Sequence, residues 1–231
     1  MSETILTFDE KNHKYFDNLG REYISVTRLI HAEKPEFNAL EIATRVTNVK
    51  GSKYYQTPIH EIIKKWADSA PLGTSLHEKV EDYINEQVIT EDSLFRPCIE
   101  QFAKLKFNGK LISEKLVFDE DLLIAGMVDL LEDTGNDPLY LYDIKSSTSN
   151  KDGEMSKDKI KDYTIQLNMY KMLVEKRMNR PCKIVGILWF KDFADMKENT
   201  KLTIVPIKEN TNCLYSILQK RKLHVRYSYS K

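Results

Sequence analysis

Residues 139–145 read LYLYDIK, and this stretch decides the fold. Its first four residues are apolar or aromatic, which is typical of a central strand of a sheet. Successive side chains of a strand point to opposite faces, so Asp143 and Lys145 share one face while Ile144 points into a core on the other. The shared face can combine a metal ligand with a base. A salt bridge at the end of the strand is the alternative interpretation.

A second apolar strand, over residues 122–131, carries Gly126-Met127-Val128-Asp129. Burial of an unpaired carboxylate costs on the order of several kcal/mol, so Asp129 needs a cation or a strong partner. If the two strands pair through the turn over residues 135–138, Asp129 lies beside Asp143. Oxygen ligands from two carboxylates suit Mg²⁺ or Mn²⁺, and hydrolysis of a phosphodiester is the reaction that such a site favours.

The remaining pattern predicts an α/β protein in which helices flank a central mixed sheet. The chain opens with an antiparallel meander of strands over residues 4–8, 13–16 and 22–25, followed by two helices separated by Pro35. A further helix is expected to begin with Thr57 as its N-cap and Pro58 in its first turn, and Pro71-Leu72-Gly73 is expected to break or redirect it. Four helices, over residues 74–87, 93–107, 157–178 and 210–223, and five strands, over residues 111–118, 122–131, 139–144, 183–190 and 201–207, complete the prediction.

Length and composition indicate one globular domain. The chain has 231 residues, 41% of them hydrophobic and 30% charged, and 35 basic residues balance 35 acidic ones. These values exclude collagen-like, low-complexity and disordered chains. Within residues 1–231 we expect an N-terminal meander and helical elaboration (1–70), a core (71–207) and a C-terminal helix with a basic tail (208–231). The absence of an 18-residue apolar run argues against a membrane span.

Four motifs in order along the chain resemble the PD-(D/E)XK nuclease superfamily, specifically its RecB-type exonuclease branch. They are Gly73-Thr74-Ser75-Leu76-His77 on a helix, Gly126-Met127-Val128-Asp129, Asp143-Ile144-Lys145, and Gln166-Leu167-Asn168-Met169-Tyr170 on the following helix. The resemblance spans residues 72–170. The opening segments 8–9, 13–15 and 25–27 also resemble the lead-in of phage-borne members and of the mitochondrial genome maintenance exonuclease.

The resemblance implies a restriction-endonuclease-like core and roles for particular residues. His77, Asp129 and Asp143, together with the backbone carbonyl of Ile144, would bind the catalytic Mg²⁺ or Mn²⁺. Asp129, Asp143 and Lys145 would be catalytic, and Lys145 would orient and activate the attacking water.

Three further residues receive lesser roles. Gln166 and Tyr170 share a helix face, and the resemblance gives them a supporting role in positioning the substrate or bracing the strands. Glu114, in the preceding strand, could serve a second metal or the substrate backbone and stays outside the expected metal set. The three cysteines, Cys98, Cys182 and Cys213, cannot supply four thiolates, so an iron–sulfur cluster is not expected.

The expected function is hydrolysis of DNA by a metal-dependent exonuclease in phage or bacterial recombination, repair or replication. The expected location is the cytoplasm of a bacterium or an infected host, with recombination or replication proteins as partners. A structure-specific or restriction-like endonuclease, or a catalytically silent nucleic-acid-binding module, are the alternatives. Because the net charge is zero, DNA must bind in a confined positive groove. The basic run over residues 220–222, followed by Tyr227 and Tyr229, is either a tail that contacts the DNA backbone or a solvated terminus.

Overall fold

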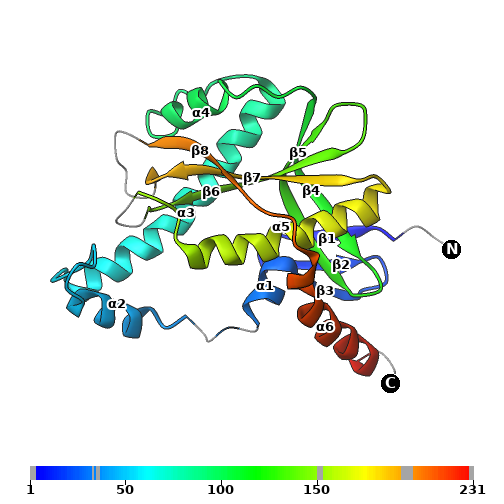
Figure 1. Ribbon diagram of the computed structural model, residues 1–231, viewed down its shortest axis with the longest axis horizontal. Helices are drawn as coiled ribbons and strands as arrows, with labels where there is room; N and C mark the ends of the chain where they lie inside the picture. Colours follow the sequence, from blue (N-terminus) through cyan, green and yellow to red (C-terminus); the bar gives the residue numbers. More distant parts are fainter. Residues whose placement is uncertain (1–3, 33, 35–36, 150–152, 194–199, 229–231) are drawn as a thin grey trace.

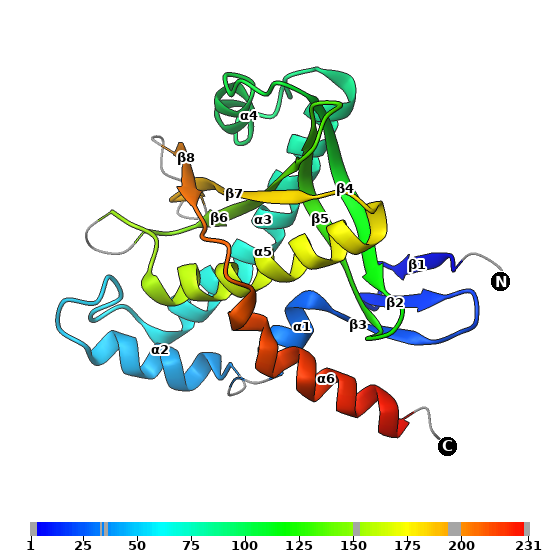
Figure 2. The same cartoon turned by 45° about the vertical axis from the view of Figure 1, so that its right-hand side comes forward.

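An eight-stranded mixed sheet runs through the protein, and helices cover its faces (Figures 1 and 2). The computed structural model describes residues 4–32, 34, 37–149, 153–193 and 200–228. Neighbouring strands follow the order β1-β2-β3-β5-β6-β7-β8, and β4 pairs with β5 outside this path. The expected α/β class, with a central mixed sheet between helices, is confirmed.

The N-terminal meander consists of β1 (Leu6–Asp9), β2 (Lys14–Asp17) and β3 (Glu22–Ser25), paired antiparallel as expected. It is continuous with the main sheet, because Ile24 of β3 pairs in parallel with Ile124 of β5. Two helices follow, α1 (Val26–His31) and α2 (Ala39–Asn48), which begin with side-chain caps from Ser25 and Asn38. Pro35, which was expected to separate them, lies outside the described residues.

A single long helix, α3 (Ile59–Glu86), replaces the two helices expected on either side of Pro71. The prediction of a break at Pro71-Leu72-Gly73 is wrong, and so is that of Thr57 as N-cap, since Pro58 holds that position. Pro71 cannot donate to the carbonyl of Ala67, yet Ile62 on one side of it and Leu76 on the other are buried. Packing therefore holds the helix through the proline. The boundary expected after residue 70 falls inside α3.

The central meander consists of β4 (Lys110–Asp119), β5 (Ile124–Asp133) and β6 (Leu139–Ser147), with antiparallel pairing as expected. The helix before it, α4 (Arg96–Phe102), is shorter than the predicted span of 93–107. The chain bends at Asn108 and Gly109, just before β4, where both backbone amides donate to the Glu132 side chain. A Cβ at Gly109 would lie 2.3 Å from the Asp133 carbonyl oxygen, so only glycine allows this approach.

The helix α5 (Lys157–Met178) has the bounds that the sequence predicts. It connects β6 to the parallel strand β7 (Cys182–Lys191), which pairs with the antiparallel edge strand β8 (Lys201–Pro206). Leu167 of α5 packs with Leu139 and Leu141 on one face of β6, whereas Leu76 of α3 packs with Ile144 on the other. The strand β6, which carries Asp143 and Lys145, thus lies between α5 and α3 (Figure 2).

The C-terminal segment forms a short turn of 3₁₀-helix, η2 (Thr211–Leu214), and then α6 (Tyr215–Ser228), which extends away from the sheet (Figure 2). Arg221 donates to the backbone carbonyls of Leu122 and Leu123 in the turn before β5. The basic run is therefore helical, and Arg221 is held by the protein itself instead of lying in a free tail. Tyr229 and Lys231 lie outside the described residues. Among the helices of the described part, none combines the length and apolarity that a bilayer crossing requires.

Replacement of Gly186 by alanine should destabilise the sheet. Gly186 has φ of 150°, next to a register shift between β6 and β7, and an added Cβ would lie 2.2 Å from the Val205 carbonyl oxygen. We expect Gly186→Ala to lower the free energy of unfolding by about 3 kcal/mol or more, measured by chemical denaturation. The matched control is Gly20→Ala, where φ is 77° and nothing lies within 4 Å; it should lower that free energy by only about 1 kcal/mol. Equal effects of the two variants would contradict the steric argument.

Candidate active site

Two carboxyl groups converge where β5 and β6 separate. The β5–β6 pairing ends with Leu130 opposite Tyr142, so the next step of the register places Asp129 opposite Asp143. There the Ile144 amide donates to Oδ2 of Asp129 at 2.7 Å, which replaces a strand-to-strand backbone bond by a side-chain bond. The two carboxyl groups also share a hydrogen bond, and Asp143 is only 1% exposed. The structure therefore brings together the two acids that the sequence singles out.

Lys145 supplies the positive charge beside this acid pair. Its Nζ lies 2.6 Å from Oδ2 of Asp143 and 3.7 Å from Oδ2 of Asp129, and it donates to the Ile144 carbonyl at 3.1 Å. The ammonium also faces the Tyr163 ring, 5.5 Å from its centroid. Burial alone would lower the pKa of Lys145, but the two carboxylates raise it well above its ordinary value. Lys145 is therefore a cation at neutral pH.

One ammonium does not neutralise two buried carboxylates, and the pKa values reflect this. Burial raises the pKa of Asp143 to about 7, against the opposing effect of Lys145 and with a further rise from Asp129. Burial acts in the same direction on Asp129, but Lys145, His77 and the Ile144 amide together lower its pKa below the ordinary value. Without a bound cation, the pair therefore keeps a proton to a higher pH than two free carboxyl groups would.

His77 and Glu114 complete a group of ligand atoms around Asp129. The nitrogen and oxygen atoms that His77, Glu114 and Asp129 offer all lie within 4.8 Å of one another. His77 comes from α3, and its Nδ1 lies 3.8 Å from Oδ2 of Asp129. Burial lowers the pKa of His77 more than Asp129 raises it, so the imidazole is neutral and able to ligate a metal.

Glu114 reaches this group through an unusual backbone conformation. It lies opposite Asp129 in the β4–β5 register, between the pairs of Ser113 with Leu130 and Lys115 with Val128, and has φ of 46°. A left-handed conformation in a strand is strained for a residue with a Cβ, on the order of 1–2 kcal/mol. Burial, together with Asp129 and Glu81, raises the pKa of Glu114 to about 8.

The donor set fits a hard divalent cation. Two carboxylates, an imidazole and the buried Asp143 are the oxygen and nitrogen ligands that Mg²⁺ and Mn²⁺ accept. Oδ2 of Asp143 is ion-paired with Lys145 but accepts no hydrogen bond of good geometry within the described residues, which leaves it able to turn to a cation. The Ile144 carbonyl, also expected as a ligand, faces Lys145 and His77.

Glu114 is the residue of this group that the expected metal set omits. The sequence did hold a signal for it, because residues 114 and 129 are equidistant from the turn between the two strands. However, every second side chain of a strand points to the same face, so the alternation of β4 alone does not single out Glu114. The positive φ that brings Glu114 to Asp129 is not a property of sequence pattern.

Gln166 and Tyr170 lie on α5 beneath the acid pair. Gln166 donates from Nε2 to Oδ1 of Asp143 at 3.1 Å, and it also hydrogen-bonds with the Tyr170 hydroxyl group. The Tyr170 ring lies against Gly126, where a Cβ would come within 2.6 Å of a ring carbon. Gly126 is thus required for α5 to pack this closely. Both α5 side chains are buried, which places them as braces of β5 and β6.

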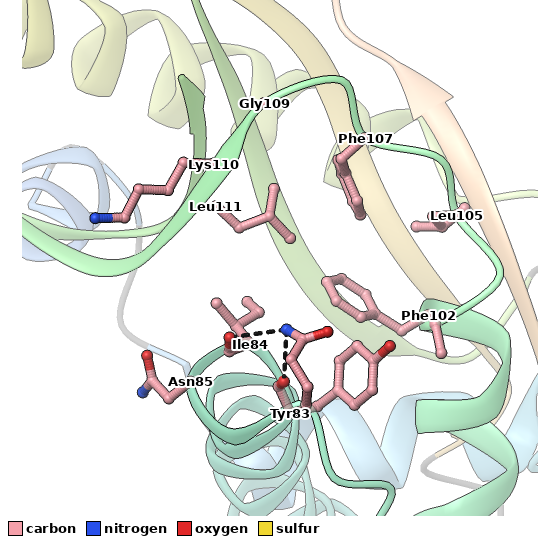
Figure 3. A pocket seen from close by; sticks show the side chains of 11 residues that line it. Tyr83, Ile84, Asn85, Phe102, Leu105, Phe107, Gly109, Lys110 and Leu111 are labelled. Carbon is pink, nitrogen blue, oxygen red and sulfur yellow. Dashed lines mark hydrogen bonds between the residues drawn. The ribbon is translucent and has the colours of Figure 1, made fainter. Parts of the chain in front are cut away.

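A hollow with a volume of about 600 Å³ lies between the end of α3, α4 and the start of β4, and none of the candidate metal ligands lines it. Figure 3 shows Phe102, Phe107 and Tyr83 around one part of it and Asn85 and Lys110 around another. Its lining contains no acidic side chain, so it offers a divalent cation no carboxylate ligand. The chemistry suggested by the ligand atoms belongs to the smaller group around Asp129.

One comparison with known proteins identifies a family. A family model described as the PD-(D/E)XK nuclease superfamily matches residues 13–212, a span that includes His77, Glu114, Asp129, Asp143 and Lys145. No curated protein matches the sequence. A solved structure titled "Crystal structure of SSO0001" has 13% sequence identity and a TM-score of 0.39, over 87% of this chain and 84% of that one.

Divalent cations should stabilise the fold through Asp129. We expect Mn²⁺ or Mg²⁺ to raise the free energy of unfolding by about 1.4 kcal/mol when the free ion is ten times its Kd, because only the folded protein assembles the ligands. Denaturation with the ion or with EDTA measures this difference. Asp129→Asn should abolish the stabilisation, whereas Asp121→Asn, an exposed acid in the neighbouring turn, should retain it. A full effect of the ion on the Asp129 variant would contradict the assignment.

The stability of the metal-free protein should fall as pH rises. The pKa values of Glu114 and Asp143 are raised from 4.5 and 3.8 to about 8 and about 7, so the folded state keeps protons that the unfolded state releases. Its free energy of unfolding should therefore decline between about pH 5 and about pH 8. Denaturation curves across this range should show a shallower decline for Glu114→Gln but not for the exposed Glu120→Gln. The same decline in wild type and Glu114→Gln would contradict the role of Glu114.

Proposed function

Because the chain belongs to the PD-(D/E)XK nuclease superfamily, we propose that it is a metal-dependent exonuclease that hydrolyses phosphodiester bonds of DNA. One observation carries the proposal: Asp129 and Asp143 converge on Lys145 at the point where β5 and β6 separate. Two carboxylates and a permanent cation in one buried place suit the cleavage of a phosphodiester, whose charge rises during attack by water.

We assign the metal to His77, Asp129 and Asp143, with the Ile144 carbonyl as a backbone ligand, and add Glu114 as a further ligand. The addition rests on its position within 4.8 Å of the His77 and Asp129 ligand atoms. A divalent cation bound by these groups supplies a Lewis acid that lowers the pKa of a bound water and offsets charge on the phosphate. The raised pKa values of Glu114 and Asp143 imply that both give up protons when they become ligands.

Lys145 acts in this proposal as a fixed cation. Because its pKa is raised, it stays protonated and cannot take a proton from water at neutral pH. Its ammonium instead donates hydrogen bonds, which orient the attacking water and stabilise negative charge on the phosphate oxygens. Asp143 holds the ammonium in place at 2.6 Å, and the Gln166 amide fixes the other oxygen of Asp143.

Gln166 and Tyr170, which lie on α5, hold the Asp143 side chain and strand β5 in position. Their burial argues that they act on the substrate through Asp143 and β5 and not by direct contact. Tyr170 fills the space above Gly126, so a smaller side chain would leave a cavity under the acid pair. We regard both as positioning residues.

The finer features of the proposal rest on the order of the four motifs. Their resemblance to the RecB-type branch favours an exonuclease over an endonuclease and Mg²⁺ as the working ion. It also favours phage or bacterial recombination, repair or replication as the setting, in the cytoplasm and with proteins of those processes as partners. DNA is the proposed substrate.

The test compares linear with closed circular DNA. Purified protein with Mg²⁺ or Mn²⁺ should degrade end-labelled linear DNA and leave closed circles intact, with no cleavage in EDTA. Asp143→Asn and Lys145→Ala should each lower the rate by at least about a hundredfold. Asp121→Asn and Lys183→Ala, exposed residues away from the site, are the matched controls and should cut at the wild-type rate.

Other outcomes would replace the proposal. Cutting of closed circles would identify an endonuclease on the same core. Binding of DNA without cleavage under any metal condition would indicate a silent binding module. Full activity of both site variants would place the chemistry elsewhere in the chain.

A further inference from the structure

A small polar pocket lies at the C-terminal end of β6, with a volume of about 200 Å³. We call it the β6-end pocket. Most of its lining comes from three elements beside the candidate active site, namely α3, β6 with the residue that follows it, and α5, and Tyr54 contributes from the loop before α3. The lining residues are Tyr54, Lys65, Trp66, Ser69, Ser146, Ser147, Thr148 and Lys159. A water molecule has a share of about 30 Å³, so the space suits one tetrahedral oxyanion with a few waters.

Lys159 brings a positive charge to the β6-end pocket. The residues that line the pocket include no acidic side chain. Lys159 makes no ion pair with any side chain in the described part of the chain, although it is half-buried. Burial and the nearby ammonium of Lys53 both lower the pKa of Lys159, which shows that the local field opposes this charge. Lys159 also lies in the first turn of α5, where the helix dipole favours an anion instead.

Ser147 provides an independent sign of a missing partner. Its side chain lines the pocket and the residue is 8% exposed. Its Oγ atom is buried and has no hydrogen-bond partner among the described residues. An unsatisfied buried hydroxyl is unfavourable by roughly 1–3 kcal/mol. Rotation about one torsion would let it donate to an oxyanion, which accepts hydrogen bonds only.

The β6-end pocket and the metal ligands lie along the same contact between α3 and β6. Ser147 is two residues beyond Lys145 on the same strand and face, a distance of about 7 Å. Ser69 precedes His77 by eight residues on α3, about 12 Å along the helix. Between them, a Cβ at Gly73 would lie 3.1 Å from Oγ of Ser146, so the helix backbone closely approaches the strand.

We propose that the β6-end pocket binds a phosphate group of the DNA strand that is cut at Asp129, Asp143 and Lys145. The inference rests on the proposed nuclease function, since that function supplies a strand with phosphates on either side of the scissile one. Lys159 supplies positive charge to the phosphate, and Ser147 donates a hydrogen bond to it. Two sources have this chemistry: a terminal phosphate at the end of the strand, or an internal phosphodiester.

The test measures binding in EDTA, where no cleavage occurs, so it gives a result even if the protein cuts no DNA. Fluorescence anisotropy with a labelled single-stranded oligonucleotide should show about tenfold weaker binding for Lys159→Ala. Lys159→Arg should keep most of the affinity because it keeps the charge. Lys161→Ala, an exposed lysine of the same helix outside the pocket, is the matched control and should change affinity less than twofold.

Ser147→Ala separates ligand binding from folding. Because the hydroxyl has no hydrogen-bond partner within the part of the chain that the structure describes, its removal should leave the melting temperature unchanged or raise it, while oligonucleotide affinity falls severalfold. A lower melting temperature with unchanged affinity would overturn the inference. So would equal losses of affinity in Lys159→Ala and Lys161→Ala, which would indicate a diffuse effect of charge.

Oligonucleotides with a 5′-phosphate, a 3′-phosphate or two hydroxyl ends distinguish the two sources. A difference between wild type and Lys159→Ala that occurs only with one terminal phosphate would assign the pocket to that strand end. The same difference with all three would assign it to an internal phosphodiester. If none shows a difference, the β6-end pocket binds no phosphate of the substrate, whatever the outcome of the nuclease assay.

Discussion

The site is governed by two carboxyl groups, Asp129 and Asp143, that are buried against a single ammonium, that of Lys145. In a medium of low dielectric constant, each unpaired charge is strongly unfavourable, so the surplus carboxylate must take a proton or a cation. Burial and the neighbouring Asp129 raise the pKa of Asp143 to about 7, so the metal-free protein keeps a proton there to a higher pH than a free carboxyl group would. A divalent cation would satisfy the same surplus without a proton. Burial of the acids would therefore favour a bound metal in the proposed site, and the hydrogen bond from Gln166 holds the Asp143 side chain in place.

The acid pair lies at a gap in the strand pairing along one edge of β5. One edge of β5 pairs with β4 along its whole length, whereas the other pairs with β3 near Ile124 and with β6 only at residues 130–132. Between these two contacts, residues 126–129 have no strand on that edge. Tyr170 packs against Gly126 in this interval, and Asp129 at its end accepts the Ile144 amide. The N-terminal meander thus helps to form the site, because β3 occupies the first part of the edge.

Periodicity in the sequence was sufficient for the elements whose own residues decide their structure. The bounds of α5, the β4–β6 meander and the approach of Asp129 to Asp143 follow from alternation, capping and hairpin register. Three features depend on distant contacts instead. The packing of Ile62 and Leu76 keeps α3 helical through Pro71. The pairing of Ile24 with Ile124 joins the meander to the sheet, and a local left-handed backbone brings Glu114 to the metal ligands. None of these is encoded in a pattern of neighbouring residues.

A chain of zero net charge can still bind a polyanion if its cations are unevenly neutralised. Many surface cations have a nearby acid, as in the pairs of Lys64 with Asp68, Lys79 with Asp82 and Arg180 with Asp133. Such pairs attract phosphate weakly, because the acid offsets the field of the base within a Debye length. Lys159 lacks an acidic partner in the described structure and is half-buried, so solvent screens its field less. Affinity for a phosphate strand would then depend on a few contacts close to Lys145, and binding would show a shallow dependence on salt.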